Sequence, residues 1–460
     1  MADKPVKNVT ASLEASIKDV MRVIDHSGLR VAYIIDEGGK LAGAVSDSEI
    51  RKAVLKGHDI KKPVRDIINT DPVVLTHDEA KSEYSSMKKI RKLIKRMPDS
   101  RFILALDNNG KPSKLLPAAA PLAKDSKVRD ANNGKHVLVV GGAGYLGSVL
   151  VRQLLKRGFK VRVLDILMYG EAPLKELEKD KNFELVAGDM RNISTLVMCL
   201  DGIDSVVNLA AIVGDPACKD KPEAAIETNF LANKALAEAC KYNQINRFIY
   251  ASTCSVYGSM EGDKLLTEES PLNPVSLYAR SKIQSEEGIL AMEDENFAPV
   301  ILRMSTLYGY SPRMRFDLVV NTMTKTAVAE KKIFVHGGGT QWRPLLHVAD
   351  AAAAYVKCLD APLKKIKGQI FNVGSEKLNI QIRDIAKAVK TQVPQADVIM
   401  EGDTTDPRNY FVSFSKLNKK LRFSIAQKLD TSIERMKDAL TSGEIKNAND
   451  PKYYNVEYNQ

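Results

Sequence analysis

The sequence has few cysteines and no long hydrophobic run. Its five cysteines are scattered over 460 residues, and no two of them form a Cys-x-x-Cys pair. This pattern argues against a disulfide framework and against a structural zinc site. No apolar run approaches the length that spans a bilayer, and the first residues lack the apolar core of a secretion signal. We therefore expect a reduced, cytoplasmic protein without a membrane span or a bound metal.

Charge is the next imbalance, because basic residues exceed acidic ones. The net charge is +11, and much of the excess lies before residue 134. In the segment 87–101, "MKKIRKLIKRMPDSR", methionines and isoleucines fall on one helical face and basic residues on the other. We interpret it as a solvated helix docked by its apolar stripe, with an acidic partner, a nucleotide or a membrane surface as alternatives. Nucleic-acid binding is not expected, because no aromatic residues are interleaved with the basic ones.

Residues 119–134 have the composition of a linker, with small residues, alternating charges and an Asn-Asn-Gly turn. Before it, residues 1–118 contain a weak repeat. Residues 17–54 predict helix, strand, turn, strand and helix, and residues 87–117 repeat the helix, strand and turn. The turns "DEGGK" and "DNNGK" supply glycine or asparagine where a positive φ is needed. We expect two domains, 1–118 and 135–460.

The repeated unit resembles a pair of CBS domains in an α+β arrangement. That family commonly binds adenine nucleotides between its two units, through a Thr-x-x-Asp signature that holds a ribose. The first unit offers Ser46 and Glu49 in "GAVSDSEIRKAV", and the second ends in "KLLP" without such a signature. The resemblance therefore implies either an adenine-nucleotide sensor or a dimerisation module without a ligand, and we expect a homodimer.

Strands and helices alternate after the linker. The segment "HVLVVGGAGYLGSVLVRQLLKRG" predicts a buried strand, a glycine turn and a helix, and "KVRVLD" predicts a second strand. Gly141, Gly144 and Gly147 would permit a tight turn, a close approach to a pyrophosphate and close helix–strand packing. Asp165 closes the second strand, where a carboxylate accepts the ribose 2′-hydroxyl and favours NAD over NADP, although Lys160 and Arg162 lie nearby.

Two further strand ends complete the predicted cofactor site. "FELVAGDM" ends with Asp189 and Met190, placed to meet the adenine. "SVVNLAAIVG" continues into Leu209, Ala210 and Ala211, which are small enough for a cofactor to lie across them. The pattern predicts an α/β fold with a doubly wound parallel sheet.

A candidate catalytic group follows. "RFIYASTCSVYG" predicts a strand with hydroxyl residues at its carboxyl end, and "SLYARSK" places Tyr278 and Lys282 four residues apart on one helical face. A neighbouring cation stabilises a phenolate and lowers the pKa of a tyrosine. We therefore assign Tyr278 as acid and base, Lys282 as its cation and nicotinamide-ribose ligand, and Thr253 as the hydroxyl that bonds the substrate oxygen.

These motifs together resemble the extended short-chain dehydrogenases/reductases, in their nucleotide-sugar epimerase and dehydratase branch. The resemblance covers residues 135–460 and rests on "GGAGYLG", "GDM", "NLAA", "STCSVYG", "YARSK" and "WRPLLHVADAA". It implies a Rossmann-like domain that binds NAD, with Tyr145 and Leu146 in the glycine motif, and a small C-terminal lobe for a nucleotide sugar. It also assigns Asn229 near the active site, Arg343 at the substrate's diphosphate, and Arg408 as a second such contact. Thr306 stands where the family has asparagine.

The resemblance leaves the reaction to be chosen. Family dehydratases carry Asp-Glu directly after the catalytic threonine, whereas Cys254 and Ser255 follow Thr253 in this sequence. This difference favours epimerisation, which we expect at C4 of a UDP- or other NDP-hexose through a transient keto sugar. A nucleotide-sugar reductase, dehydrogenase or dehydratase on the same site, and a non-catalytic nucleotide-sensing scaffold, are the alternatives.

Overall fold

The computed structural model describes residues 6–27, 29, 31–81, 102–117, 136–259, 265–402 and 408–455. The chain divides into two compact units, residues 1–126 and 127–460. The basic segment 87–101 and the predicted linker 119–134 lie outside the described residues. Each unit is described by itself below.

The first unit contains two small sheets. In the first sheet β1 pairs parallel with β2, and β2 pairs antiparallel with β3; in the second sheet β4 and β5 are antiparallel. The elements are η1 (Val6–Val9), β1 (Thr10–Ser12), α1 (Ile17–Ser27), β2 (Val31–Ile35), β3 (Leu41–Ser46), α2 (Asp47–Leu55), η2 (Val64–Asp66), α3 (His77–Lys81), β4 (Phe102–Leu106) and β5 (Pro112–Pro117). Side chains from both sheets share one core, in which Tyr33 packs with Leu104 and Leu115.

The two predicted turns have the same construction. Asp36 Oδ1 accepts the Lys40 N–H at 2.9 Å, and Asp107 Oδ1 accepts the Lys111 N–H at 2.8 Å. The glycine before each lysine has a positive φ, 77° at Gly39 and 78° at Gly110. The turn of the predicted repeat is therefore present twice in the backbone, because each aspartate closes its own turn in the same way.

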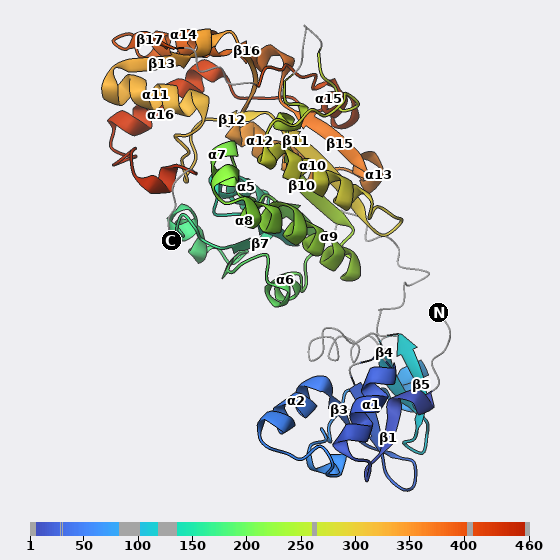
Figure 1. Ribbon diagram of the computed structural model, residues 1–460. Coiled ribbons are helices and arrows are strands. Elements are labelled where there is room, and N and C mark those ends of the chain that lie inside the picture. The colour runs from blue at the N-terminus through green and yellow to red at the C-terminus, as the bar shows by residue number, and fades with distance from the viewer. Residues whose placement is uncertain are drawn as a thin grey trace. The chain divides into compact units, whose positions relative to one another are not determined.

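The second unit is built on a seven-stranded sheet in the order β15-β11-β10-β9-β6-β7-β8. Figure 1 labels β15, β11, β10 and β7 of this sheet. Every pair in the sheet is parallel. The strands are β6 (His136–Val140), β7 (Lys160–Asp165), β8 (Phe183–Ala187), β9 (Ser205–Asn208), β10 (Arg247–Thr253), β11 (Ala298–Met304) and β15 (Gln369–Val373). The order reverses direction at β6, as in a doubly wound Rossmann-like sheet, so the predicted fold class is confirmed.

Both faces of this sheet are covered by helices, which explains its continuous apolar strands. Val137 and Val139 of β6 face one hydrophobic core, and Leu138 and Val140 face another. The first core contains side chains of α5 (Tyr145–Lys156) and α12 (Val348–Asp360). The second contains side chains of α6 (Ile193–Cys199), α9 (Ala232–Tyr242) and α10 (Leu277–Leu290). The remaining connecting helices are η3 (Ala172–Lys179), α7 (Asp215–Asp220), α8 (Pro222–Ile226), η4 (Glu227–Leu231), η5 (Cys254–Tyr257), α13 (Leu363–Ile366) and α15 (Ser415–Leu421).

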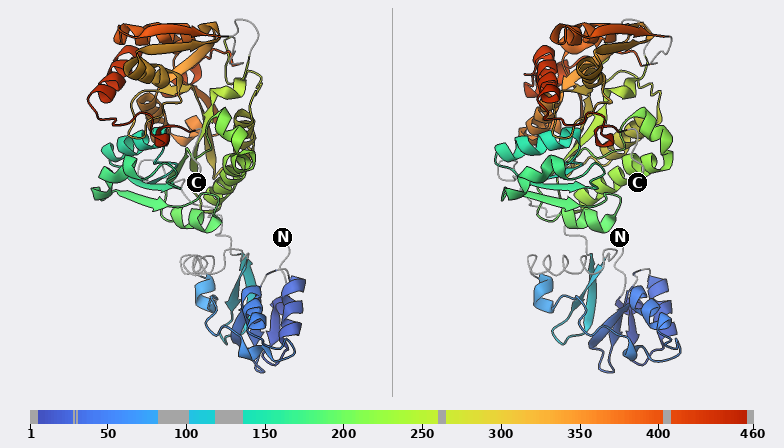
Figure 2. Two further views of the ribbon diagram at one scale, coloured as in Figure 1. Left: turned by 60° about the vertical axis from the view of Figure 1, so that its left-hand side comes forward. Right: turned by 90° about the vertical axis from the view of Figure 1, so that its left-hand side faces the viewer.

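Many of the orange and red C-terminal elements gather at one end of the unit in both views of Figure 2, while α12, α13 and β15 lie in or against the sheet. The elements at that end form a lobe with its own core, from Tyr308 to Ile445. Its elements are β12 (Thr306–Tyr308), α11 (Val319–Glu330), β13 (Lys332–His336), η6 (Gly337–Gly339), β14 (Trp342–His347), η7 (Glu376–Leu378), β16 (Asn379–Gln381), α14 (Ile382–Gln392), β17 (Asp397–Glu401), α16 (Leu429–Thr441) and η8 (Pro451–Tyr453). This lobe is the small C-terminal part that the sequence predicted.

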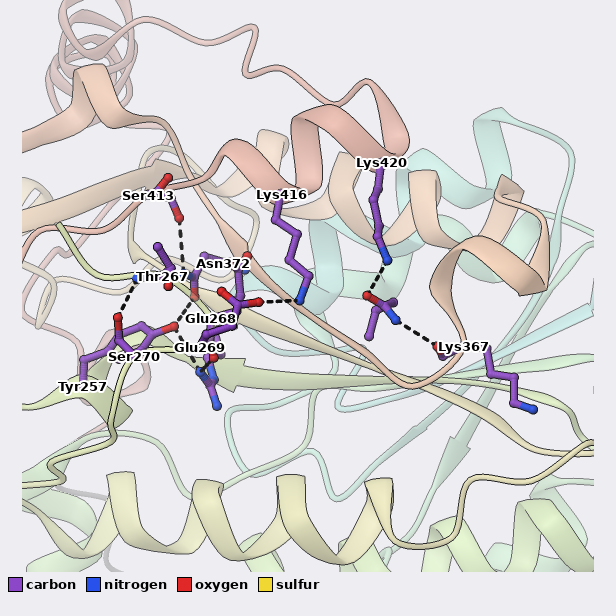
Figure 3. Close-up of polar contacts among 12 residues, drawn as sticks. Tyr257, Thr267, Glu268, Glu269, Ser270, Lys367, Asn372, Ser413, Lys416 and Lys420 are labelled. Atoms are coloured by element: carbon purple, nitrogen blue, oxygen red, sulfur yellow. Dashed lines mark hydrogen bonds and ion pairs between the residues drawn. The ribbon is translucent and has the colours of Figure 1, made fainter.

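A polar layer joins edge strand β15 to the segments around it (Figure 3). Asn372 on β15 accepts a hydrogen bond from the Tyr257 hydroxyl at 2.7 Å and donates its main-chain N–H to Glu268 at 2.8 Å. Its side-chain amide also donates to the Ser413 carbonyl at 3.2 Å. The segments that carry Tyr257, Glu268 and Ser413 are thus all fixed to edge strand β15.

Candidate active site

A cavity of about 1930 Å³ lies along the carboxyl edge of the parallel sheet. Its wall includes the strand ends at Val140, Asp165, Thr253 and Met304, as expected for ligand sites in open α/β sheets. Every predicted cofactor-binding residue lines it: Gly141, Gly144, Tyr145, Leu146, Gly147, Asp165, Asp189, Met190, Leu209, Ala210, Ala211, Tyr278 and Lys282. The cavity therefore brings together residues from five separate stretches of the sequence.

The glycine corner has no room for side chains. Gly141 has a φ of 82°, and a Cβ there would meet the Ala210 nitrogen at 2.8 Å. A Cβ on Gly147 would meet the Gly141 oxygen at 2.2 Å, so α5 packs directly on the turn. Gly142, which the sequence analysis did not single out, is restricted too, because its Cβ would meet Val163 at 2.7 Å. Gly144 caps α5 without any side-chain bond and leaves the first N–H groups of the helix beside the cavity.

Tyr145 ties this corner to the C-terminal lobe. Its hydroxyl donates to the Gly309 carbonyl at 2.6 Å and accepts from Asn321 Nδ2 at 3.1 Å. Its carbonyl accepts a hydrogen bond from Ser311 Oγ at 2.7 Å. The lobe segment that follows β12 is thereby fixed against the first turn of α5.

Asp165 ends β7 on the cavity wall. Its two carboxylate oxygens accept the Ala143 N–H at 2.9 Å and the Leu167 N–H at 2.8 Å. Burial raises the pKa of this carboxyl, and the main-chain bonds oppose the rise. Arg162, a possible cation for a 2′-phosphate, donates instead to Glu184 at 2.7 Å. The aspartate is thus fixed in place with lone pairs left for a ribose.

The next strand end carries Asp189 and Met190. Asp189 Oδ2 accepts Nε and Nη2 of Arg191 at 2.9 and 2.6 Å, and this bond holds the pKa of the carboxyl below its usual range. Met190 is buried against the second core while still reaching the cavity. The polar and apolar groups placed here suit the predicted adenine contact.

Helix α10 carries Tyr278 and Lys282, the predicted catalytic pair. Ser276 caps it by accepting the Ala279 N–H at 3.2 Å, which fixes the first turn at Tyr278. Lys282 is 2% exposed, its Nζ donates to the Ala251 carbonyl at 2.8 Å, and it lies 5.8 Å from the centre of the Tyr278 ring. Burial lowers the pKa of Lys282 to about 8. Burial raises the pKa of Tyr278, and the charge of Arg315 opposes that rise.

Thr253 and Ser255 place hydroxyls at the end of β10 on the same wall. Thr253 Oγ1 accepts the Ser255 N–H at 3.1 Å and so caps η5. Cys254 between them is buried and turned away, with its Sγ 3.3 Å from the Arg303 carbonyl. Tyr278, Lys282 and Thr253 therefore meet at one cavity, as the sequence predicted.

Asn229 lies behind the cavity wall, not on it. The residue is fully buried in the π-helical turn η4, and its side chain bonds both the N–H and the carbonyl of Ile212, at 2.8 and 2.9 Å. Its carbonyl accepts Asn233 Nδ2 and the Ser285 hydroxyl. Asn229 thus holds the loop after β9 against α10. Because Ile212 of that loop lines the cavity, Asn229 positions part of the cavity wall.

The two arginines assigned to the substrate differ in position. Arg408 lines the cavity and forms an ion pair with Asp215 on α7, at 3.3 Å. Arg343 is 5% exposed and does not line the cavity; its guanidinium donates to the Trp342 and Arg408 carbonyls. The contact to Arg408 shows that Arg343 supports the main chain from which Arg408 reaches the cavity.

Charged residues of "SPRMRFD" form a part of the wall that the sequence analysis missed. Arg313, Arg315 and Asp317 all line the cavity. Arg315 and Asp317 form a two-bond ion pair, with N–O distances of 3.1 and 2.5 Å. The available signal was two arginines and an aspartate at alternate positions in a largely apolar stretch, directly after a strand of the predicted lobe.

In the first unit, Ser46 and Glu49 bond to each other. Ser46 caps α2 by accepting the Glu49 N–H, and the Glu49 carboxylate accepts the Ser46 N–H at 2.7 Å and its hydroxyl at 2.8 Å. This is a capping box, which stabilises the helix start without a ligand. Adenine-nucleotide binding at these residues stays a prediction.

A family model described as NAD dependent epimerase/dehydratase family matches residues 137–374, more than half of the chain. The chain belongs to this family. A CBS domain model matches residues 1–56. The family is NAD-dependent, so the cofactor is NAD. The protein is an enzyme of the nucleotide-sugar epimerase/dehydratase family.

Relatives and solved structures cover the second unit. A Bacillus subtilis (strain 168) protein described as an uncharacterized UDP-glucose epimerase is 30% identical over 66% of this chain and 96% of its own length. The dTDP-D-glucose 4,6-dehydratase of Homo sapiens is 31% identical over 52% of this chain and 69% of its own. The structure of UDP-glucuronic acid 4-epimerase from Bacillus cereus, in complex with UDP-glucuronic acid and NAD, has a TM-score of 0.61 at 27% identity, covering 67% of this chain and 99% of that one.

The residues of the cavity fit the cofactor. The glycine corner lines the cavity with main chain that carries no side chains, and the first turn of α5 lies on the same wall. Main-chain N–H groups at such a helix start bind a diphosphate, and Asp165 is placed for a ribose. In the described part of the chain, no helix is long and apolar enough to cross a membrane, and no group of three His, Cys, Asp or Glu side chains could hold a metal ion.

Proposed function

We propose that this enzyme epimerises a nucleotide-linked hexose at C4, with Tyr278 as its acid and base. The observation that carries the proposal is the strand end at Thr253. Tyr278 and Lys282 lie beside it on the cavity wall, while the two positions after Thr253 carry a buried thiol and a hydroxyl instead of carboxylates. The chain therefore retains Tyr278 and Lys282, which would support hydride transfer. It has no carboxylates at positions 254 and 255, where family dehydratases carry the acid and base for elimination of water.

In this proposal Tyr278 removes the proton of the C4 hydroxyl and later returns it. Lys282 and Arg315 favour the phenolate by their charge, and Thr253 bonds the reacting oxygen. NAD supplies the hydride acceptor and donor at the sugar carbon. The 4-keto sugar rotates between the two hydride transfers so that it presents its opposite face. The cavity must therefore hold the nucleotide firmly and leave the hexose free to rotate. Arg408 on the wall would hold the substrate's diphosphate with its guanidinium fork.

The test is incubation of the purified enzyme with UDP-glucose, UDP-galactose, UDP-glucuronic acid and their N-acetylated counterparts, followed by NMR of the sugar ring. We expect inversion at C4 of one substrate pair with no net change in NADH absorbance. Net NADH formation would identify a dehydrogenase, and a 4-keto-6-deoxy product would identify a dehydratase; either outcome refutes the proposal.

A matched pair of tyrosine variants tests the role of Tyr278. Tyr278→Phe should lower turnover by about 10²- to 10⁴-fold with the bound NAD retained, because it removes only the acid and base. Tyr242→Phe, on an exposed helix end away from the cavity, should leave turnover unchanged. Turnover of Tyr278→Phe within a few-fold of the parent would contradict the assignment.

A further inference from the structure

Arg313 is a buried cation on the cavity wall. Its side chain lines the cavity and is 3% exposed. The guanidinium lies 3.8 Å above the Tyr169 ring, and Nη2 donates to Asn455 Oδ1 at 2.7 Å. Its Nε is buried without a hydrogen-bond partner among the described residues. A buried polar atom without a partner is unfavourable, and because Arg313 lines the cavity, an acceptor on a ligand there would satisfy it.

The electrostatic surroundings of Arg313 also favour an anion. Arg315, two residues away, is a second buried cation, and it is already paired with Asp317. Burial, together with the charge of Arg315, lowers the pKa of Arg313 to about 10. The two guanidinium groups share the Asp317 carboxylate, and the charge of Arg313 also acts on the Asp165 carboxylate at the ribose end of the cavity. An anion in the cavity would relieve both the desolvation and the repulsion.

The location of Arg313 indicates which anion. Tyr169, on which Arg313 stacks, belongs to the loop that follows Asp165 at the end of β7. The segment that carries Arg313 is fixed to the first turn of α5, where Ser311 Oγ bonds the Tyr145 carbonyl and lies 3.1 Å from Ser148 Oγ. Arg313 therefore lies between the ribose end and the glycine corner. The anionic part of a dinucleotide between these two points is its diphosphate.

We propose that Arg313 binds the diphosphate of NAD from the C-terminal lobe, as a counterpart to the main-chain N–H groups of the glycine corner. Tyr169 and Asn455 are positioning residues that orient its guanidinium. A cofactor held from both the sheet domain and the lobe stays bound through repeated turnovers. This assignment does not depend on which sugar or which carbon the enzyme acts on.

Equilibrium binding to the full-length enzyme, stripped of cofactor, tests the proposal without using activity. Arg313→Met should weaken NAD and ADP-ribose alike by at least about tenfold, because both lose a charge-assisted contact to the diphosphate. Adenosine, which has no phosphate, should bind Arg313→Met and the parent equally. Arg313→Lys should fall between them, since it keeps the charge but loses the planar fork.

Arg157→Met is the matched control. It removes the same group from a surface ion pair with Asp360, in which the arginine side chain is 54% exposed. NAD affinity should stay within twofold of the parent. If Arg313→Met fails to fold by circular dichroism, Asn455→Ala replaces it: the arginine remains, loses its orienting oxygen, and should weaken NAD severalfold.

An NAD affinity of folded Arg313→Met within twofold of the parent would overturn the proposal. If the binding of UDP is unchanged as well, Arg313 contacts neither diphosphate. If the binding of UDP is weaker, Arg313 belongs to the diphosphate of the nucleotide sugar. Neither result bears on epimerisation, which is judged from the sugar product, so the two proposals can fail separately.

Discussion

Burial of the charged Lys282 side chain lowers the stability of the folded protein. It lowers the pKa of Lys282 to about 8, well below the ordinary value for lysine, so the protonated form is disfavoured in the folded state. Its main-chain partner is the Ala251 carbonyl, and its Nζ lies 4.8 Å from the centre of the Tyr250 ring. A lysine buried under these conditions is typical of a functional site, which supports the role proposed for it beside Tyr278.

We therefore predict that Lys282→Met abolishes turnover and stabilises the cofactor-free protein at pH 7, by up to about 3 kcal/mol. The unfolded chain binds more protons than the native protein between about pH 8 and the ordinary lysine pKa, so the stability of the parent rises with pH through that window. The advantage of the variant should be largest below pH 8 and shrink above it. Thermal unfolding from pH 6.5 to 10 measures this; a gap that widens above pH 8 would contradict the assignment.

Glu286 and Arg303 form a buried ion pair beside β10, the strand that ends at Thr253. Both side chains are 3% exposed, the N–O distance is 2.6 Å, and the Ser252 hydroxyl also donates to Glu286. We predict that Glu286→Gln lowers the free energy of unfolding by about 3 kcal/mol, because Arg303 is left buried without its counter-ion. Urea denaturation measures this. The exposed neighbour Glu287→Gln is the control and should change stability by less than about 0.5 kcal/mol.

Single residues also show how much of the candidate site can be predicted from the sequence. Tyr278 and Lys282 were predictable because four residues of helix place them on one face, a local geometric rule. Asn229 and Arg343 belong to motifs of the family, but both contact main-chain groups of other segments, at Ile212 and Arg408. Those contacts depend on tertiary packing, which the sequence does not show. Arg313 was missed because its neighbours, Tyr169 and Asn455, are more than 140 residues away on either side.

At the scale of elements, α5 packs on the glycine corner so closely that Gly147 has no room for a side chain. We predict that Gly147→Ala disrupts NAD binding and lowers the free energy of unfolding by about 3 kcal/mol, because its Cβ would meet main-chain atoms of Gly141 and Gly142 at 2.2 and 2.6 Å. Gly288→Ala on α10 is a matched control, since its Cβ would lie 3.8 Å from the nearest atom.

Helix propensity should make Gly288→Ala neutral or slightly stabilising, by about 0.5 to 1 kcal/mol. Thermal unfolding and NAD retention after gel filtration compare the two variants. Equal behaviour of Gly147→Ala and Gly288→Ala would mean that the corner can relax, against the close contacts described for it.

Elements were the scale at which the sequence was most informative. Alternating strand and helix patterns predicted the parallel sheet, because a strand buried on both faces is apolar throughout. The twin turns of the first unit were predictable from Asp36 and Asp107 with their glycines. The lobe was predicted only as a small C-terminal part, because its strands are short and pair with segments far away in the chain, as β13 does with β17.

At the scale of the whole molecule, the chain consists of two units with separate cores. The three largest cores of the second unit contain only residues from Val137 onward. We predict that residues 127–460 alone fold, retain NAD and epimerise the substrate at a rate within a few-fold of the full chain. Circular dichroism and the sugar NMR assay measure this, and an insoluble or cofactor-free product would contradict it.

The same pair of proteins tests the first unit. If the CBS-like unit binds an adenine nucleotide, calorimetry with ATP and AMP should give heat with the full chain that is absent with residues 127–460. Saturating NAD should be present in both samples, so that its own adenine site is filled. Equal signals would place the site in the second unit. The predicted homodimer can be assessed on the same samples by light scattering.

The core of the C-terminal lobe is assembled from three separate stretches, Tyr308–Leu345, Ile385–Ala396 and Ile433–Ile445, with α12, β15 and α15 returning to the sheet between them. Such an interleaved lobe has no single pair of cut points, so a contiguous segment that contains the whole lobe core also contains α12, β15 and α15. An exchange of the lobe between two related chains would therefore exchange part of the sheet with it.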